Sequence, residues 1–239
     1  MTDLIALREQ LLVELNRHAE PAYRELVHRR YSMDVASFLG VRTPTIHQIA
    51  NRYYKTIKPL SVEDRLAACH VLLEARTYEL KVAAFRWGHL CRNDFAVPHL
   101  SALAGWLEHY VDDWIDCDDL CLHVLGEFFL RYPELAQTTY TWTASTNRWV
   151  RRGAAVALIL PVRKGHQRET AFEIADRLLD DSVDLVQKAY GWLLKEASKL
   201  HPNEVFHFVT ERRNVMPRIA YRYALEKLPD DLRRAAMQS

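Results

Sequence analysis

Apolar residues recur at helical spacing along almost the whole chain, and this pattern limits the fold more than any other feature. No stretch sustains the alternation of a half-buried strand, and the β-branched runs at 138–143 and 156–160 are no exception. With 7 glycines and 9 prolines in 239 residues, the chain has few positions that would interrupt a helix. We therefore predict an all-α protein.

Start signals support several of the expected helices. Thr43, which precedes a proline, Ser61, Ser182 and Asn203 are expected N-caps because their side chains can accept hydrogen bonds from the first helical amides. Disorder is an open alternative for the last residues, LRRAAMQS. The expected spans are 3–18, 21–31, 44–56, 62–75, 78–92, 98–110, 115–131, 134–143, 147–162, 168–180, 183–199, 203–213 and 217–228.

A loose repeat accompanies the helices. Trp114, Trp149 and Trp192 follow one another at intervals of 35 and 43 residues, each near a helix start or middle. Paired helices of this period resemble HEAT-like repeats, which stack into an α-α superhelix, or solenoid, with a concave face. No long linker or low-complexity stretch divides the sequence, so we expect one domain over residues 1–239.

Composition limits where the protein works. No uncharged apolar run approaches the roughly 18 residues of a membrane span, and the N-terminal segment lacks a signal-peptide core. We expect a cytoplasmic monomer without a membrane partner. The four cysteines form no CxxC pair, so reduced core thiols are the favoured interpretation. A metal site at Cys117, Cys121 and His123 is the alternative, and we expect neither metal nor other cofactor.

The net charge of +1 hides an asymmetry. Residues 1–138 carry 15 basic and 19 acidic side chains, whereas residues 139–239 carry 17 basic and 12 acidic ones. A phosphate-bearing partner is therefore to be sought on the second part of the chain.

Acidic residues gather around WIDCDD at 114–119. Asp112, Asp113 and Asp116 suit a solvated helix start, but Asp118 borders the apolar stripe of the helix that follows. Trp114 stands four residues before Asp118 and so shares its face. The alternative makes Asp118 a first-turn carboxylate and Trp114 a core indole.

Two further helices carry residues that are hard to explain by packing alone. Arg152, with Arg148 one turn away, falls on the small-residue side of its helix; it can bind a carboxylate or phosphate, or form an ion pair between repeats. Gly191 costs roughly 1 kcal/mol inside a helix, so it indicates close approach beside Trp192, with Lys195 on the exposed side. A packing glycine beside a core tryptophan is the alternative.

Four segments together resemble the AlkD-like family of DNA alkylation repair glycosylases, whose fold is built from HEAT-like repeats. They are YSMDVASFLGVRTP, WIDCDDLCLHVLGEFF, ASTNRWVRRGAAVAL and QKAYGWLLKEA, in the family's order and at similar separations over nearly the full chain. The resemblance implies that Asp118 is the catalytic carboxylate, with Trp114 and Trp192 as active-site indoles. It also implies that Arg152 and Tyr31 contact DNA.

The resemblance implies an enzyme that removes cationic purines, such as 3-methyladenine and 7-methylguanine, from duplex DNA held on a concave basic face. Asp118 would stabilise the positive charge that develops on the sugar and position a water. Arg148 and Lys195 are added to the expected DNA contacts. The alternatives are a non-catalytic module that binds unusual DNA structures and a protein–protein scaffold.

Overall fold

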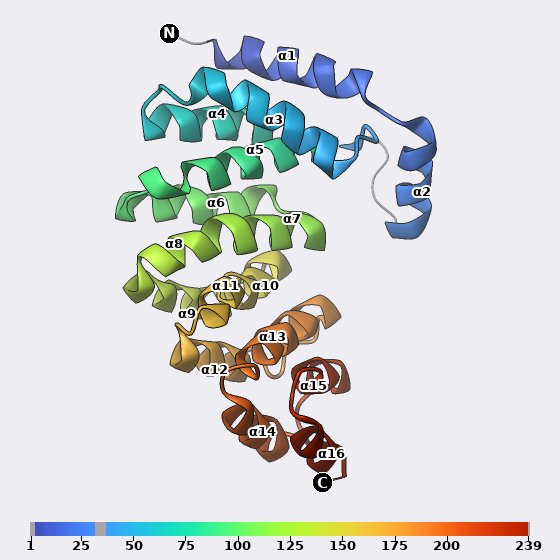
Figure 1. The fold of residues 1–239 in the computed structure, drawn as a ribbon, viewed down its shortest axis with the longest axis vertical. Helices are drawn as coiled ribbons and strands as arrows, with labels where there is room; N and C mark the ends of the chain where they lie inside the picture. The colour runs from blue at the N-terminus through green and yellow to red at the C-terminus, as the bar shows by residue number, and fades with distance from the viewer. Residues whose placement is uncertain (1–2, 32–36, 239) are drawn as a thin grey trace. The chain divides into compact units, whose positions relative to one another are not determined.

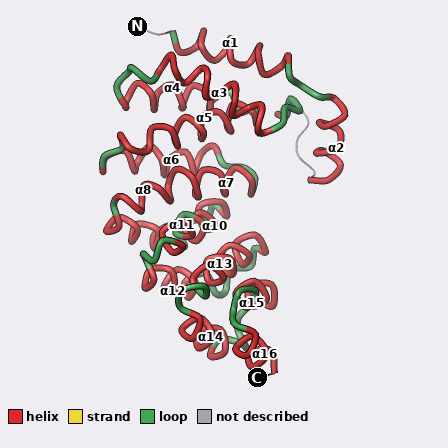
Figure 2. The backbone as a smooth tube through the Cα atoms, in the orientation of Figure 1, coloured by secondary structure: helices red, strands yellow, loops and turns green. Residues whose placement is uncertain are grey.

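The computed structural model describes residues 3–31 and 37–238, where every regular element is helical (Figure 1, Figure 2). The prediction of an all-α protein is confirmed. Residues 1–102 and residues 103–239 form two compact units, and each is described by itself. The single domain expected over the whole chain, and its concave basic face, stay predictions.

The first unit is built on amphipathic helices whose buried faces meet. Leu7, Leu11 and Leu15 form the buried stripe of α1, and α3 and α4 both pack on α5. The indole of Trp87 on α5 donates to the carbonyl of Ala50 on α3 at 2.8 Å, which fixes the two helices in register. The helices are α1 (Leu4–Arg17), α2 (Pro21–Tyr31), α3 (Thr43–Ile57), α4 (Val62–Glu74) and α5 (Tyr78–Cys91), followed by short 3₁₀ turns at Arg92–Asp94 and Val97–His99.

A buried carboxylate holds the connector before α3. Glu79 accepts hydrogen bonds from the backbone amides of Leu39, Gly40 and Val41 at 2.9 to 3.1 Å. Burial raises the pKa of Glu79, although these amide hydrogen bonds oppose the shift. An irregular connector was predicted before residue 44. Its described part, residues 37–42, is held in place by Glu79.

The second unit contains two rows of helices. Along one row α7, α10, α13 and α15 contact each other in turn, while α12 packs on α13 and α14 contacts α13, α15 and α16 (Figure 1). The stacked pairs agree with the predicted HEAT-like organisation. None of the described helices is long and apolar enough to cross a membrane. The elements are α6 (Leu100–Tyr110, which begins in the first unit), α7 (Trp114–Leu120), α8 (Gly126–Arg131), α9 (Thr139–Trp142), α10 (Arg148–Val156), α11 (Ile159–Arg163), α12 (Arg168–Arg177), α13 (Asp184–Ala197), α14 (Pro202–Glu211), α15 (Arg218–Leu225) and α16 (Asp230–Gln238), with a 3₁₀ turn at Pro133–Thr138.

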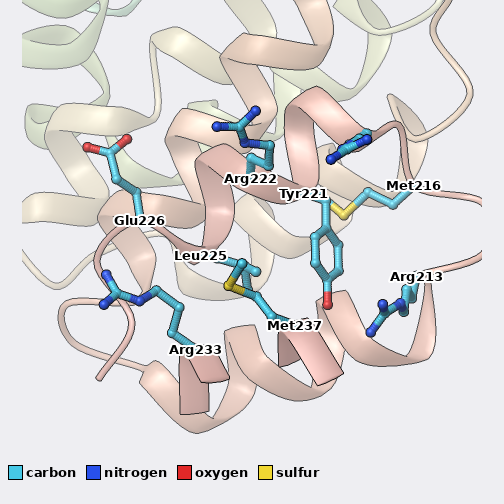
Figure 3. Close-up of a pocket in the computed structure, with 9 residues that line it drawn as sticks. Arg213, Met216, Tyr221, Arg222, Leu225, Glu226, Arg233 and Met237 are labelled. Atoms are coloured by element: carbon cyan, nitrogen blue, oxygen red, sulfur yellow. The ribbon is translucent and has the colours of Figure 1, made fainter. Parts of the chain in front are cut away.

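Close packing of α13 on α15 depends on Gly191. A β-carbon there would lie 2.8 Å from the carbonyl oxygen of Ala220 and 2.8 Å from Cβ of Tyr223. The close approach predicted at this glycine is therefore found, and its partner is α15. On the other side of α15, side chains of α15 and α16 border an open pocket (Figure 3).

Two long predicted helices are interrupted. The span 115–131 is α7 and α8 joined by a π-helical turn at Cys121–Leu125. Its predicted stripe is nevertheless buried throughout, including Cys117, Val124 and Phe128. The span 147–162 breaks between α10 and α11.

Helix starts confirm one expected cap and correct others. Ser61 accepts from the backbone amide three residues on, at 3.1 Å, as predicted. Thr43 is the first helical residue rather than the cap, which is Arg42, because the proline that follows occupies the first turn. Asn203 is likewise inside its helix, since Pro202 begins it.

The remaining differences lie later in the chain. Ser182 is not the cap of α13; the cap position is Val183, whose amide donates to the carboxylate of Asp181 at 2.9 Å. The C-terminal tail is a helix, α16, so the disorder considered for it is wrong over Asp230–Gln238. Its Ala236 is fully buried, which supplies the packing that a tail would lack.

Candidate functional site

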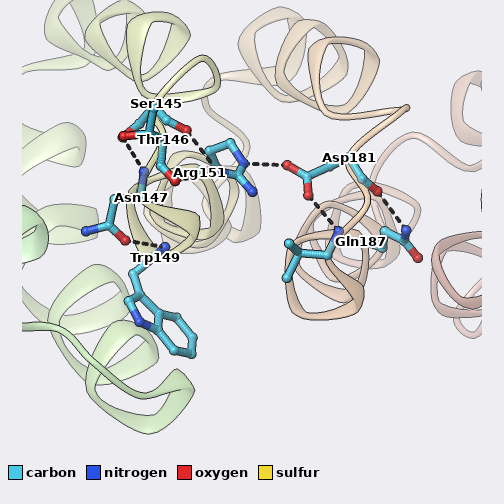
Figure 4. A network of polar contacts seen from close by, with 8 residues as sticks. Ser145, Thr146, Asn147, Trp149, Arg151, Asp181 and Gln187 are labelled. Atoms are coloured by element: carbon cyan, nitrogen blue, oxygen red, sulfur yellow. Dashed lines mark hydrogen bonds and ion pairs between the residues drawn. The ribbon is translucent and has the colours of Figure 1, made fainter.

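A polar network fixes the start of α10 against the start of α13 (Figure 4). Asn147 caps α10 by accepting from the amide of Trp149 at 2.9 Å. Arg151 donates through Nε to Oδ2 of Asp181 at 2.6 Å, while Oδ1 of the same carboxylate accepts from Val183. The two helix starts are therefore tied together next to the residues that sequence analysis singled out.

Arg152 and Asp118 form a buried ion pair. Nε and Nη2 of Arg152 donate to Oδ1 of Asp118 at 3.1 and 2.6 Å, and Nη1 donates to the carbonyl of Leu185 at 2.5 Å. The guanidinium thus joins α7, α10 and α13. This is the ion pair between repeats that the sequence left open as one interpretation of Arg152. Whether Arg152 also contacts DNA stays a prediction.

The second oxygen of Asp118 is left available. Both hydrogen bonds from Arg152 go to Oδ1, whereas Oδ2 accepts none from the described residues. The side chain is 18% exposed, so it is neither in bulk solvent nor sealed from it. Burial raises the pKa of Asp118; Arg152 opposes that shift, and the nearby charge of Asp113 adds to it. The carboxylate is only partly compensated.

Trp114 is the first residue of α7, one turn before Asp118. Asp113 caps the helix by accepting from the amide of Ile115 at 2.8 Å. Trp114 is 37% exposed, so the alternative of a core indole is wrong. Asp116, which was expected to be solvated, is instead 1% exposed.

Trp192 lies among a different set of charges. Its indole Nε1 donates to Oε1 of Glu196 at 3.2 Å, and Cζ of Arg163 lies 5.8 Å from its ring centroid. None of its hydrogen bonds or ring contacts in the described part of the chain goes to Asp118. The structure therefore does not join the second predicted indole to the carboxylate through a direct contact.

Glu196 was not predicted. Its side chain is 4% exposed and pairs with Arg163 at 3.0 Å and with Lys199 at 2.5 Å. Burial alone would raise the pKa of Glu196, but hydrogen bonds and charge from Arg163 and Lys199 outweigh it and lower the pKa to about 2. Its spacing from Trp192 and Lys199, four and three residues, was the available signal.

The other expected DNA contacts differ in their surroundings. Arg148 is exposed, with its guanidinium 4.6 Å from the ring centroid of Trp149. Lys195 was expected on the exposed side, but its side chain is only 15% exposed and pairs with Glu226 at 3.2 Å. Tyr31 ends α2, and its side chain lies outside the described residues.

The four cysteines are buried free thiols, which confirms the core interpretation. Cys117 and Cys121 lie with their sulfurs 4.0 Å apart, and Cys117 donates to the carbonyl of Trp149. Within residues 3–31 and 37–238, no group of three or more His, Cys, Asp or Glu side chains is placed to hold a metal ion.

One family model and two solved structures match most of this chain. The family model described as DNA alkylation repair enzyme matches residues 11–228. A structure from Enterococcus faecalis, described as a predicted DNA alkylation repair enzyme, superposes with a TM-score of 0.79 at 16% identity, covering 89% of this chain and 98% of its own. Smu.31 from Streptococcus mutans UA159 gives 0.57 at 18% identity, covering 87% and 98%. These likenesses show the fold. No curated protein matches the sequence.

Proposed function

The chain belongs to the DNA alkylation repair enzyme family, and from this premise we propose that it is a DNA glycosylase acting on cationic alkylated purines in duplex DNA. The observation that carries the proposal is the state of Asp118. Its Oδ2 accepts no hydrogen bond from the described residues, the side chain is partly exposed, burial raises its pKa against the effect of Arg152, and an exposed indole, Trp114, stands one turn away.

The chemistry requires an anion at the sugar. Alkylation at purine N3 or N7 gives the base a positive charge, so the N-glycosidic bond breaks with its electron pair moving to the base, which leaves neutral. Positive charge then develops at C1′. A fixed carboxylate in a partly dry site stabilises that charge more than it stabilises the ground state. In the proposal, Asp118 is this carboxylate.

Water completes the reaction. In the proposed step, a water oxygen bonds to C1′ while Oδ2 of Asp118 accepts one of its protons. Because Oδ1 is held by two nitrogens of Arg152, the carboxylate cannot rotate freely, and Oδ2 keeps a defined direction. Arg152 thereby acts first as the residue that positions Asp118. A phosphate contact by Arg152 is a further part of the proposal.

Aromatic rings assist through the charge of the lesion. Trp114 and Trp192 are proposed to present their faces to the cationic nucleoside, each cation–π contact contributing about 1 kcal/mol. Because Trp192 is tied to Glu196 rather than to Asp118, it would act from a separately fixed position. Selectivity then comes largely from the lesion's own charge, with 3-methyladenine and 7-methylguanine as the proposed substrates.

Release of methylated bases tests the proposal. Wild-type protein is expected to liberate 3-methyladenine or 7-methylguanine from methylated duplex DNA, and Asp118→Asn to do so about 100- to 1000-fold more slowly because one charge-stabilising group is lost. Asp112→Asn is the matched control: it removes the same charge from an exposed position in the same cluster and should leave the rate nearly unchanged.

The other outcomes separate the alternatives. Base release that is unchanged in Asp118→Asn would rule out the mechanism. Binding of duplex DNA without any release would favour a non-catalytic DNA-structure module, and no binding at all would favour a protein–protein scaffold.

A further inference from the structure

The pocket beside α15 and α16 is rich in arginine (Figure 3). Its cavity measures about 620 Å³. Arg213, Arg218, Arg222 and Arg233 line it together with a single acidic side chain, Glu226. Four cations around one open cavity repel one another unless an anion enters. What the pocket can bind therefore depends on which of these arginines already has an acidic partner.

Two of these arginines are already engaged. Arg233 pairs with Asp230 at 2.7 Å, which neutralises it. Arg213 donates to the carbonyl of Ala236 at 2.8 Å, which fixes the side chain. Tyr221 donates to the same carbonyl at 2.6 Å and so helps to form the wall of the pocket.

Arg218 and Arg222 are uncompensated. They lie one turn apart on α15, both are exposed, and neither has an ion pair or hydrogen bond within the described residues. Glu226 follows Arg222 by one turn and could have neutralised it, but its carboxylate pairs with Lys195 of α13 at 3.2 Å. The acidic residue of the pocket is therefore committed elsewhere.

The location of α15 connects this pocket with the proposed catalytic row. Gly191 allows α15 to approach the backbone of α13, and the pair Lys195–Glu226 adds a second tie between these helices. Arg152 of α10 in turn donates to the backbone of α13 at Leu185. The pocket thus belongs to the same run of contacting helices as Asp118, three helices further along.

We propose that Arg218 and Arg222 bind backbone phosphates of the DNA, forming an anchoring site separate from the place of base removal. The inference rests on the proposed function, which makes DNA the ligand. Guanidinium groups bind phosphate oxygens through two parallel hydrogen bonds. Their Cβ atoms, one helical turn apart, are separated by about 5–6 Å, a spacing that lets each take a different phosphate of one strand.

The floor of the pocket fits the same ligand. Met216, Leu225 and Met237 supply apolar surface between the arginines. A nucleic-acid strand alternates phosphates with deoxyribose, whose C–H faces can cover such surface. Contacts of this kind fix the register of the duplex without reading its sequence.

The test is equilibrium binding of undamaged duplex DNA as a function of salt. The double variant Arg218→Gln with Arg222→Gln is expected to bind about tenfold more weakly, and its plot of log affinity against log salt should be shallower by about 2 because two phosphate contacts are lost. The temperature of unfolding should be unchanged, since neither side chain has an ion pair or hydrogen bond to lose among the residues that the structure describes.

A matched control separates a site from overall charge. Lys227→Gln with Arg234→Gln removes two charges from exposed positions near and on the same helices, but neither residue lines the pocket. Equal weakening by both double variants would overturn the site in favour of general attraction. No weakening by the pocket double variant would overturn it outright.

Two more measurements make the outcomes distinct. Base release that persists in the pocket variant at saturating protein, alongside normal DNA affinity, removes this inference and leaves the glycosylase. Weaker DNA binding by the pocket variant, together with no base release by the wild type, would support the phosphate site and rule out the glycosylase. Inorganic phosphate should displace duplex from the wild type better than chloride at equal ionic strength, and should lose that advantage in the pocket variant; an equal advantage for both proteins would contradict a phosphate site at Arg218 and Arg222.

Discussion

Two carboxylates in the same row of helices, Asp118 and Glu196, meet opposite electrostatic conditions. Asp118 has one guanidinium on one oxygen, and that guanidinium is shared with a backbone carbonyl. Glu196 has two cations and the indole of Trp192. Burial dominates at Asp118 and raises its pKa, whereas at Glu196 the partners outweigh burial and lower the pKa to about 2.

The difference separates structure from chemistry. A carboxylate whose charge is fully compensated by neighbouring cations interacts weakly with a further cation that appears during a reaction. A carboxylate whose charge is only partly compensated can still stabilise such a cation. Asp118 is therefore the group suited to a developing positive charge, and Glu196 is suited to holding Trp192 and two cations in place. The following predictions test this contrast.

The pH dependence of base release should show the largest effect. The reaction needs ionised Asp118, so the rate should fall about tenfold per pH unit below the midpoint. Because burial raises the pKa of Asp118, the midpoint should lie above the ordinary pKa of an aspartate. A midpoint below that value would mean that Asp118 is as well compensated as Glu196. Rates are measured on methylated duplex against an enzyme-free blank.

The next largest effect should follow removal of the partner that Asp118 has among the described residues. Arg152→Gln should lower the free energy of unfolding by about 4 kcal/mol, because a buried carboxylate loses its cation. Asp118 should then take up a proton more readily, which moves the midpoint of base release upward. Arg152→Lys, which keeps the charge without the two-nitrogen grip, should fall between. An unmoved midpoint in Arg152→Gln would show that the pair does not control this carboxylate.

Removing the charge of Glu196 should cost somewhat less. Glu196→Gln is expected to lower the free energy of unfolding by about 3 kcal/mol at neutral pH. A folded pKa of about 2 lies below the ordinary 4.5, so the wild type carries this stability above about pH 4.5 and loses it as the pH falls toward 2. Urea titrations between pH 2 and 4.5 should show that the free energy of unfolding depends less on pH in the variant than in the wild type. The exposed Glu211→Gln should change neither quantity.

The smallest effect should follow loss of one of two partners. Arg163→Gln leaves Lys199 on Glu196, and the arginine side chain is 40% exposed, so we expect about 1 kcal/mol or less. A loss as large as that of Arg152→Gln would contradict the view that Glu196 is doubly compensated. Lys199→Gln, which removes the other cation, provides the comparison.

Local spacing made part of this site predictable. The four-residue step from Trp114 to Asp118 placed both on one face, and the apolar stripe showed that Asp118 borders the core. The same reasoning put Arg152 on a buried side. It could not name the partner, because Asp118 lies 34 residues away and only the stacking of helices brings the two together.

Other parts were out of reach or were overlooked. Glu196 stands at helical spacing from both Trp192 and Lys199, but acidic and basic residues at that spacing are common on solvated faces, so its burial was not expected. Lys195 is less exposed than predicted because it pairs with Glu226, 31 residues away in the sequence. Two predicted caps were wrong because of neighbouring residues. The amide of Val183 donates to Asp181 rather than to Ser182, and Pro202 begins α14, which places Asn203 inside the helix.

The π-helical turn at Cys121–Leu125 determines how the side chains of α7 are rotated about the helix axis relative to those of α8. It takes up one more residue per turn than an α-helix, and each residue in an α-helix advances the direction of its side chains by about 100°. Shortening this turn by a single residue would leave α8 seated in the core and swing Trp114 and Asp118 away from α10. The direction in which Trp114 and Asp118 point relative to α8 is thus set by residues that follow them in the sequence.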